Sequence, residues 1–116
     1  MNYQVEQKTS LLAVIDIGEE LSHGRRESAN ELRDLCKSLE DEGTLTFVLD
    51  FKKVKLCPSI VFGNLLVLGK HISEKGGRIY LANPSEHVEK AAKITGLTTT
   101  ITLVHSVDEA LEAEGS

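Results

Sequence analysis

The sequence predicts a single α/β domain over residues 1–116, with a mostly parallel central sheet, an N-terminal β-β pair and about four helices. Two observations point to this class. After the first two strands, apolar runs of strand length alternate with stretches of helical periodicity, which is typical of parallel strands joined by helical crossovers. A length of 116 residues with 41% hydrophobic residues is also enough for one core of ordinary size. We therefore expect one domain.

The first half of the chain is expected to hold three strands and one helix. Residues 3–8 alternate weakly and residues 11–17 are apolar and β-branched, so these segments predict adjacent strands. After a polar stretch at 18–26, apolar residues recur at helical spacing over 29–39, which predicts an amphipathic surface helix. Residues 45–51 are apolar almost without interruption, the pattern of a central strand covered on both faces.

The second half is expected to hold two strands and three helices. One helix begins near Pro58, because proline in a first turn loses no needed hydrogen bond. Its apolar residues lie nearly all round, so it should be largely buried, and Gly76-Gly77 ends it. Strands are expected at 78–82 and 101–104. Between them, Asn83-Pro84-Ser85 opens a helix that Gly96 ends. A capping box at 106–109 predicts a terminal helix, whose last residues are expected to fray.

Composition narrows the class of function. Thirteen Lys and Arg against 18 Asp and Glu leave a formal net charge of -5, which argues against a nucleic-acid partner. Cys36 and Cys57 lack the spacing of a zinc site or a disulfide framework. No apolar run approaches the length of a membrane span, and the first residues do not resemble a signal peptide. We therefore expect a cytoplasmic protein without membrane contact.

The link from the central strand into the helix near Pro58 is the most informative segment. In open α/β sheets, function is most often found in the loops that follow the carboxyl ends of strands. The unpaired, positively polarised N–H groups of a first helical turn can hold a phosphate, a carboxylate or an acidic side chain of a partner. The residues expected to form a partner-binding surface here are Cys57, Pro58, Ser59, Ile60 and Val61.

Ser59 is the candidate for phosphorylation. A phosphoryl group there would add nearly two negative charges beside the positive helix end, stabilising the helix and reversing the sign of a docking surface. The structural alternative is that Ser59 only caps the helix and Pro58 only starts it. The bare residues favour that structural interpretation.

Several segments together match a known family. They are 47–51, 54–59, 62–66, 75–85, 94–97 and 106–111, together with Val88. The strongest parts are the Gly-Gly strand with its Asn-Pro-Ser turn at 76–85 and the Thr-Gly-Leu helix end at 95–97, because their spacing to the Leu-Asp pair at 49–50 also matches. On these segments, almost the whole chain resembles STAS domains, the fold of bacterial anti-sigma factor antagonists.

The resemblance implies partner switching. In that family an unmodified antagonist binds an anti-sigma kinase, frees a sigma factor, and is inactivated by phosphorylation in an Asp-Ser-Ser/Thr-Gly motif. When the motif is aligned on Val54 and Gly63, its four positions are Pro58, Ser59, Ile60 and Val61, so the usual phosphoacceptor is Ile60. Either Ser59 has taken over this role or the domain is a constitutive, non-switching relative. The apolar motif also predicts a contact that depends less on charge than in the switching relatives.

Other residues have structural explanations. Cys57 beside a helix start raises the alternative of a Cys57-dependent enzyme, but no CxxxxxR spacing is present and the following apolar run is typical of a buried thiol. A helix stop explains Gly76-Gly77, and the charged segments 25–27 and 40–42 are expected to be solvated helix ends. The histidines are scattered and predict surface roles rather than a metal site: His23, His71, His87 and His105.

The sequence thus predicts a non-enzymatic regulatory module without catalytic residues, metal or cofactor. The resemblance implies a protein partner, an anti-sigma factor or a related kinase-like protein. The alternative from another class is a small-ligand or nucleotide-sensing STAS module, because a crevice at the end of the sheet could hold a nucleotide or a lipid tail.

Overall fold

A computed structural model describes residues 3–18 and 26–115, with only the backbone of residues 26–28. Most of the expected polar stretch before the first helix lies outside the described residues, as do His23 and Arg25. No helix in the described part of the chain is long and apolar enough to cross a membrane.

Over the described residues, the order of helices and strands is the predicted one, with one addition. The addition is η2 (Leu97–Thr99), a single 3₁₀ turn, which is too short to produce a periodic pattern in the sequence. The other elements are β1 (Gln4–Gln7), β2 (Leu12–Asp16), α1 (Arg26–Asp41), β3 (Thr46–Asp50), α2 (Ser59–Glu74), β4 (Arg78–Ala82), α3 (Glu86–Ile94), β5 (Ile101–Val104) and α4 (Val107–Gly115).

The sheet is mixed, with the strands in the order β1-β2-β3-β4-β5. β1 runs antiparallel to β2, with Gln4 opposite Asp16, and the later pairs are parallel. This topology confirms the N-terminal β-β pair and the mostly parallel sheet. β3 lies in the middle and is buried along its whole length, as its uninterrupted apolar sequence predicts.

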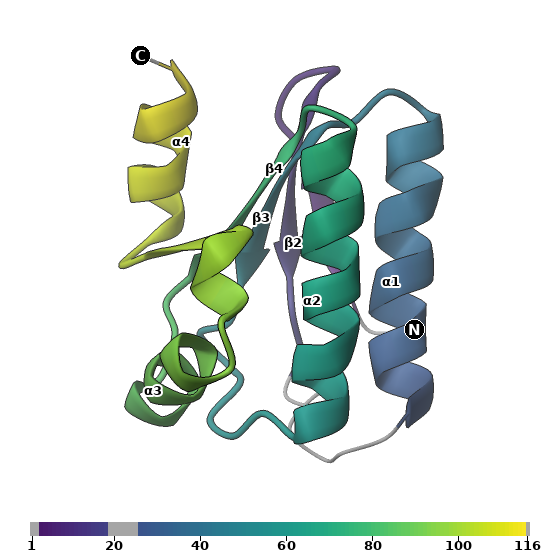
Figure 1. The fold of residues 1–116 in the computed structure, drawn as a ribbon. Coiled ribbons are helices and arrows are strands. Elements are labelled where there is room, and N and C mark those ends of the chain that lie inside the picture. Colours follow the sequence, from purple (N-terminus) through teal and green to yellow (C-terminus); the bar gives the residue numbers. More distant parts are fainter. Residues whose placement is uncertain (1–2, 19–25, 116) are drawn as a thin grey trace.

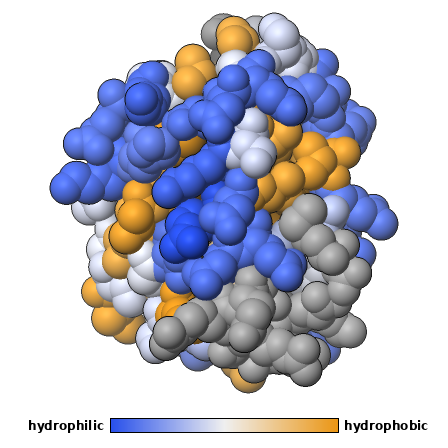
Figure 2. All heavy atoms as spheres, turned by 90° about the vertical axis from the view of Figure 1, so that its right-hand side faces the viewer, coloured by the Kyte–Doolittle hydropathy of each residue, from blue (hydrophilic) through white to orange (hydrophobic). Residues whose placement is uncertain are grey.

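Helices cover both faces of this sheet (Figure 1). α1, α2 and α3 pack on one face, where Phe47, Leu49 and Leu81 belong to the larger apolar core. α4 packs on the other face, where Ala110 is buried against a smaller core that includes Val48. Figure 2 looks onto α1 and shows a mostly hydrophilic outer surface along that helix.

The last turn of α4 is held to the sheet by hydrogen bonds. The Glu114 carboxylate accepts from the Thr46 hydroxyl (3.1 Å) and from the Tyr80 hydroxyl (2.5 Å). At the start of the helix, the Ser106 hydroxyl accepts from the Glu109 N–H at 3.1 Å, as the capping box predicts. The helix continues to Gly115, and the expected fraying of the final residues stays a prediction.

The two glycines after α2 have different roles. Gly76 adopts φ +84°, a left-handed conformation that suits glycine and ends the helix. A Cβ at Gly77 would lie 2.1 Å from the carbonyl oxygen of Leu45, so this position has no room for a side chain. A helix stop therefore explains Gly76, whereas close approach of the backbone explains Gly77.

α2 buries one face rather than its whole circumference. The side chain of Val67, in the middle of the helix, is 62% exposed, and Gly63 also faces outward. The expectation of a largely buried helix is therefore correct only for the face that lies on the sheet. The buried residues of that face are Val61, Phe62, Leu65, Leu68, Gly69 and Ile72.

Candidate functional site

The loop from β3 to α2 is fixed at its start by Asp50. This carboxylate is almost fully buried, and its Oδ1 accepts from the backbone N–H of Lys52 at 3.1 Å and from the Asn83 side chain at 3.0 Å. Asn83 lies just after β4, in a left-handed conformation with φ +56°. The Asp50–Asn83 hydrogen bond therefore ties together the loops that follow two neighbouring strands.

A second hydrogen bond ties the same two loops further along. The Ser85 hydroxyl donates to the carbonyl oxygen of Lys55 at 2.7 Å and accepts from the N–H of Val88 at 3.1 Å. Ser85 is thus both the cap of α3 and a support for the loop that leads into α2. The Asn-Pro-Ser segment opens this helix as predicted, whereas the capping role of Ser85 and its contact with Lys55 come from the structure.

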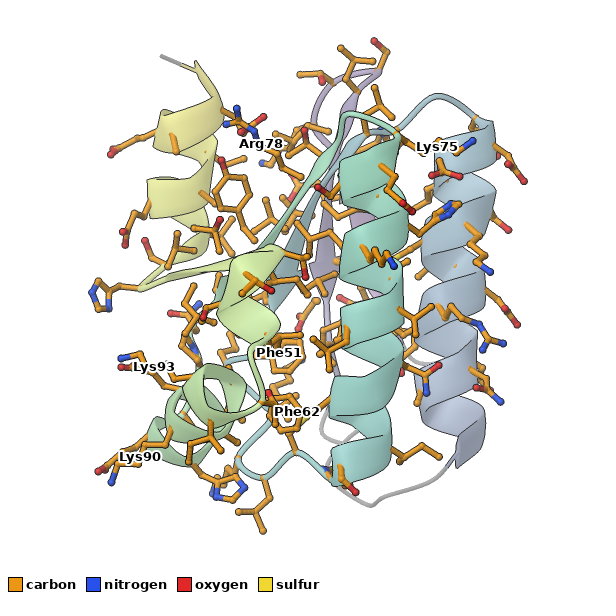
Figure 3. The ribbon with its side chains drawn as sticks, in the orientation of Figure 1. Phe51, Phe62, Lys75, Arg78, Lys90 and Lys93 are labelled. Carbon is orange, nitrogen blue, oxygen red and sulfur yellow. The ribbon has the colours of Figure 1, made fainter. Side chains whose placement is uncertain are left out.

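Aromatic side chains anchor the base of this loop. Phe51 follows β3 and Phe62 lies in the first turn of α2, and both point into the core between α2 and α3 (Figure 3). Both are nearly fully buried. The loop therefore begins and ends on buried rings. Of the residues between them, Val54 and Cys57 are also buried, whereas Leu56 reaches the surface.

The first turn of α2 carries no side-chain cap. Pro58 is the residue before the helix, with φ -63° and ψ 156°, and Ser59 is the first helical residue. The carbonyl oxygen of Pro58 accepts from Val61 N–H at 3.0 Å, whereas the N–H groups of Ser59 and Ile60 have no acceptor among the described residues. The interpretation of Ser59 as the helix cap is therefore wrong, and no acidic residue offsets the positive end of the helix.

The five predicted site residues divide by exposure. Ser59 is exposed, and Pro58 and Ile60 are half-buried. Cys57 and Val61 are buried in the larger core, so they position this surface and do not form it. Leu56 was not among the five, although its side chain is 57% exposed beside them. An exposed leucine at a loop end has no distinct sequence pattern, so only the structure identifies it as part of the surface.

The Cys57 thiol is unsuited to nucleophilic chemistry. Burial raises its pKa to about 12, whereas an activated thiolate needs a pKa shifted downward. Burial also raises the pKa of Cys36 to about 12. Both thiols are therefore protonated at neutral pH, and the structure agrees with the expectation of a buried, unreactive Cys57.

The histidines and the acidic segment at 40–42 have different environments. His87 and His105 are exposed, as predicted. His71 of α2 instead contacts Glu40 of α1, with Nε2 and Oε1 separated by 3.0 Å, so Glu40 is not simply a solvated helix end. Within the described ranges, His, Cys, Asp and Glu side chains form no group that could hold a metal ion.

A polar hollow of about 310 Å³ lies beside the carboxyl ends of β2 and β3. Asp16 and Asp50, which are paired in register, line it together with Lys52. Asp16 Oδ1 is buried without a hydrogen bond among the described residues, and its Oδ2 lies 3.4 Å from the Lys53 ammonium. This hollow adjoins the start of the β3–α2 loop.

The fold and this strand-end surface define a small α/β domain without an evident catalytic group in the described residues. A family model, the STAS domain, matches residues 2–110, and the chain belongs to the STAS domain family. This confirms the resemblance inferred from the sequence motifs. Comparison with curated proteins gives no match.

Solved structures of regulatory proteins share the fold. The Bacillus anti-sigma factor antagonist SpoIIAA, in its unphosphorylated form, is 23% identical with a TM-score of 0.80, over 98% of this chain and 97% of that chain. A STAS domain protein from Planctomyces limnophilus is 17% identical with a TM-score of 0.80, over 98% of each chain. RsbS from Moorella thermoacetica is 14% identical with a TM-score of 0.75, over 97% of this chain and 94% of that chain.

Proposed function

We propose that this chain, as one STAS unit over residues 1–116, is a cytoplasmic, non-enzymatic regulator of the anti-sigma factor antagonist type that acts by binding a protein. Its partner is an anti-sigma factor or a related kinase-like protein, and the outcome is regulation of transcription by partner switching. The contact surface consists of Leu56, Pro58, Ser59 and Ile60, which we call the α2-start surface.

One observation carries this proposal: an exposed leucine and an uncapped helix start lie on a rigidly supported loop. The supports are the hydrogen bonds from Asn83 to Asp50 and from Ser85 to Lys55. A preformed surface loses little conformational entropy on binding, which favours affinity. The surface is mainly apolar, so we expect the affinity for the partner to change little with added salt.

Phosphorylation at Ser59 is a separate part of the proposal. Its hydroxyl is exposed and makes no hydrogen bond with the described residues, so a kinase can reach it. SpoIIAA, which shares the fold, has been solved in a phosphorylated form. Incubation with the partner kinase followed by intact-mass measurement tests this part. If the wild-type chain gains one phosphate and Ser59→Ala gains none, Ser59 is the phosphorylated residue. If the wild-type chain gains no phosphate, the protein is a constitutive binder.

The binding experiment uses two leucines of nearly equal exposure. Leu56 is 57% exposed in the α2-start surface, and Leu11 is 56% exposed before β2. The wild-type chain and both Leu→Asp variants are used to capture proteins from host extract, and the captured partner is then titrated by calorimetry. We expect Leu56→Asp to weaken binding about tenfold or more and Leu11→Asp to leave it unchanged. Equal affinities for the three chains would refute the α2-start surface.

The small-ligand alternative has an observation of its own, the polar hollow beside Asp16 and Asp50. A nucleotide or another polar metabolite that occupied it would raise the unfolding temperature by binding only the folded chain. Thermal shift against a metabolite panel, repeated with Asp16→Asn, separates this function from protein binding. Strong stabilisation by one compound, lost in Asp16→Asn, would favour the ligand module.

A further inference from the structure

The outward face of α2 contains a glycine that no contact in the described chain explains. Gly63 is exposed, its φ is not positive, and a Cβ added there would meet no atom within 4 Å. Among helix-interior residues, only proline is less favourable than glycine. The two buried or constrained glycines nearby, Gly69 and Gly77, differ because an added Cβ would clash. The open space above Gly63 thus has no use within the described residues.

Apolar side chains lie on both sides of Gly63 on this face, and the exposed Ser59 lies one turn before it. At about 100° per residue, Val67 lies about 40° and Ile60 about 60° to one side of Gly63, while Leu66 lies about 60° to the other side. Val67 is 62% exposed, and Ile60 and Leu66 are half-buried. Gly63 therefore leaves open space between these apolar side chains, and we call this position with its flanking residues Ile60, Leu66 and Val67 the Gly63 notch. It continues directly from the α2-start surface.

The neighbouring helix shows that this pattern is particular to α2. Among the described side chains of α1, the exposed ones are Glu31, Asp34, Lys37, Ser38 and Asp41, none of them apolar. The exposed positions of α2 include Gly63 and Val67 beside four polar residues, Ser59, Lys70, Ser73 and Glu74. The two helices lie beside each other on the same face of the sheet (Figure 1). A hydrophilic outer face is the usual state of such a helix, so the apolar notch on α2 indicates a surface that another molecule covers.

Lysines stand at both ends of the Gly63 notch. Lys55 precedes α2, and Lys70 lies about two turns beyond Gly63. Neither has an ion-pair partner among the described residues, whereas Lys52 and Lys53 lie 3.4 Å from the carboxylates of Asp50 and Asp16. Glu74 and Lys75, both exposed, follow Lys70 at the far end of the helix. The surface is therefore apolar in the middle with one net formal positive charge at each end, in a chain whose formal net charge is -5.

We infer that the Gly63 notch receives an amphipathic α-helix of the partner, with an apolar side chain over Gly63 and acidic side chains near Lys55 and Lys70. This inference rests on the proposed function and specifies its partner. A bare glycine lets a second helix approach closely. The side chains of Ile60 and Val67 on one side and of Leu66 on the other provide the ridges between which a partner residue packs.

A second copy of this chain is a poorer occupant. Pairing two α2 helices in antiparallel orientation about Gly63 would bring Lys55 of one copy beside Lys70 of the other. Parallel pairing would set each lysine against its equivalent. Both arrangements place like charges together, whereas a helix with acidic ends meets opposite charges at both.

The probe for this inference is a phage-displayed library of 18-residue amphipathic helices with a randomised apolar face. Two versions carry either Glu or Lys at both ends of that face, and both are panned against the full chain. We expect binders from the Glu version only. Synthetic peptides of the selected sequences should bind Gly63→Leu about tenfold more weakly than wild type, because the added side chain fills the notch.

Gly115 supplies the matched control, because it is exposed, has no positive φ and also has no atom within 4 Å of an added Cβ. Gly115→Leu should bind the peptides as wild type does, and circular dichroism should show that both variants are folded. Absence of binders from the Glu version, equal recovery from the Lys version, or equal affinity for Gly63→Leu and wild type would each overturn the inference.

The two proposals fail in different ways. If Leu56→Asp abolishes capture of the natural partner but Gly63→Leu does not weaken the helical peptides, the α2-start surface stands and the Gly63 notch is not a helix site. If Leu56→Asp and Ile60→Asp leave capture of every host protein unchanged, the proposed function itself is refuted.

Discussion

Gly63→Ala should stabilise the folded chain. A Cβ at this position meets no atom within 4 Å, so the substitution introduces no clash. Glycine in a helix interior is less stable than alanine by about 0.8–1.0 kcal/mol, partly because the unfolded chain loses conformational freedom with alanine. Since no native contact of Gly63 is lost, nearly the whole difference should appear. For a domain of this size, about 1 kcal/mol corresponds to a rise in Tm of roughly 4 °C.

Gly69→Ala provides the contrast within the same helix. Here the added Cβ would lie 2.6 Å from Thr100 Oγ1 and 3.0 Å from Ile101 Cγ1, in the packed contact between α2 and the sheet edge. The clash should outweigh the gain in helix propensity, so the free energy of unfolding should fall by about 1 kcal/mol or more.

Urea unfolding followed by circular dichroism gives both values, and an unchanged m-value shows that the extent of unfolding is the same. If Gly63→Ala lowered the free energy of unfolding, Gly63 would make a contact within the chain that alanine disrupts. The glycine would then have a structural role, and the inferred partner helix would be refuted.

Three further outcomes follow from the structure. Gly77→Ala should lower the free energy of unfolding by about 2 kcal/mol or more, because the added Cβ would lie 2.1 Å from the Leu45 carbonyl oxygen. A decrease of less than about 0.5 kcal/mol in urea unfolding would contradict this close approach. Tyr80→Phe should cost about 1 kcal/mol near pH 7 through loss of the 2.5 Å hydrogen bond to Glu114. Burial raises the pKa of Tyr80, so the folded chain keeps this phenol neutral. The stability advantage of wild type over Tyr80→Phe should therefore diminish as pH rises above about 10, where the phenol of the unfolded chain ionises. A stability difference that did not change with pH would contradict this expectation. Burial raises the pKa of both Cys36 and Cys57 to about 12. Both thiols should therefore be unreactive to a thiol reagent at pH 8 in the native chain and reactive in denaturant. Rapid labelling of Cys57 in the native chain would contradict this and would show that the start of α2 opens.

Sequence patterns predicted the fold well because the local sequence of each strand and helix favours the structure that it adopts. The apolar run of β3, the Asn-Pro-Ser turn before α3 and the capping box before α4 each carry their structure in a few adjacent residues. The same patterns could not reveal contacts between distant segments. The close approach of Gly77 to Leu45 and the contact between His71 and Glu40 depend on how separate elements pack.

The start of α2 was predicted from the sequence, but the exposure of its side chains was not. Proline and serine at a helix start were visible in the sequence, so the beginning of the helix was located correctly. Which side chains reach solvent depends on the path of the loop, and that path is set by Asp50, Asn83 and Ser85. Cys57 and Val61 consequently lie inside while Leu56 lies outside.

The placement of glycines along α2 has a mechanical consequence. In the C-terminal half, Gly69 lets the helix sit tightly against Thr100, and Gly77 brings the chain against Leu45 directly after the helix ends. That half cannot slide along the sheet without a collision. A partner that displaces the start of α2 would therefore move it relative to a C-terminal half that stays fixed on the sheet. Displacement would appear as bending of the first two turns, whose helix propensity Gly63 lowers.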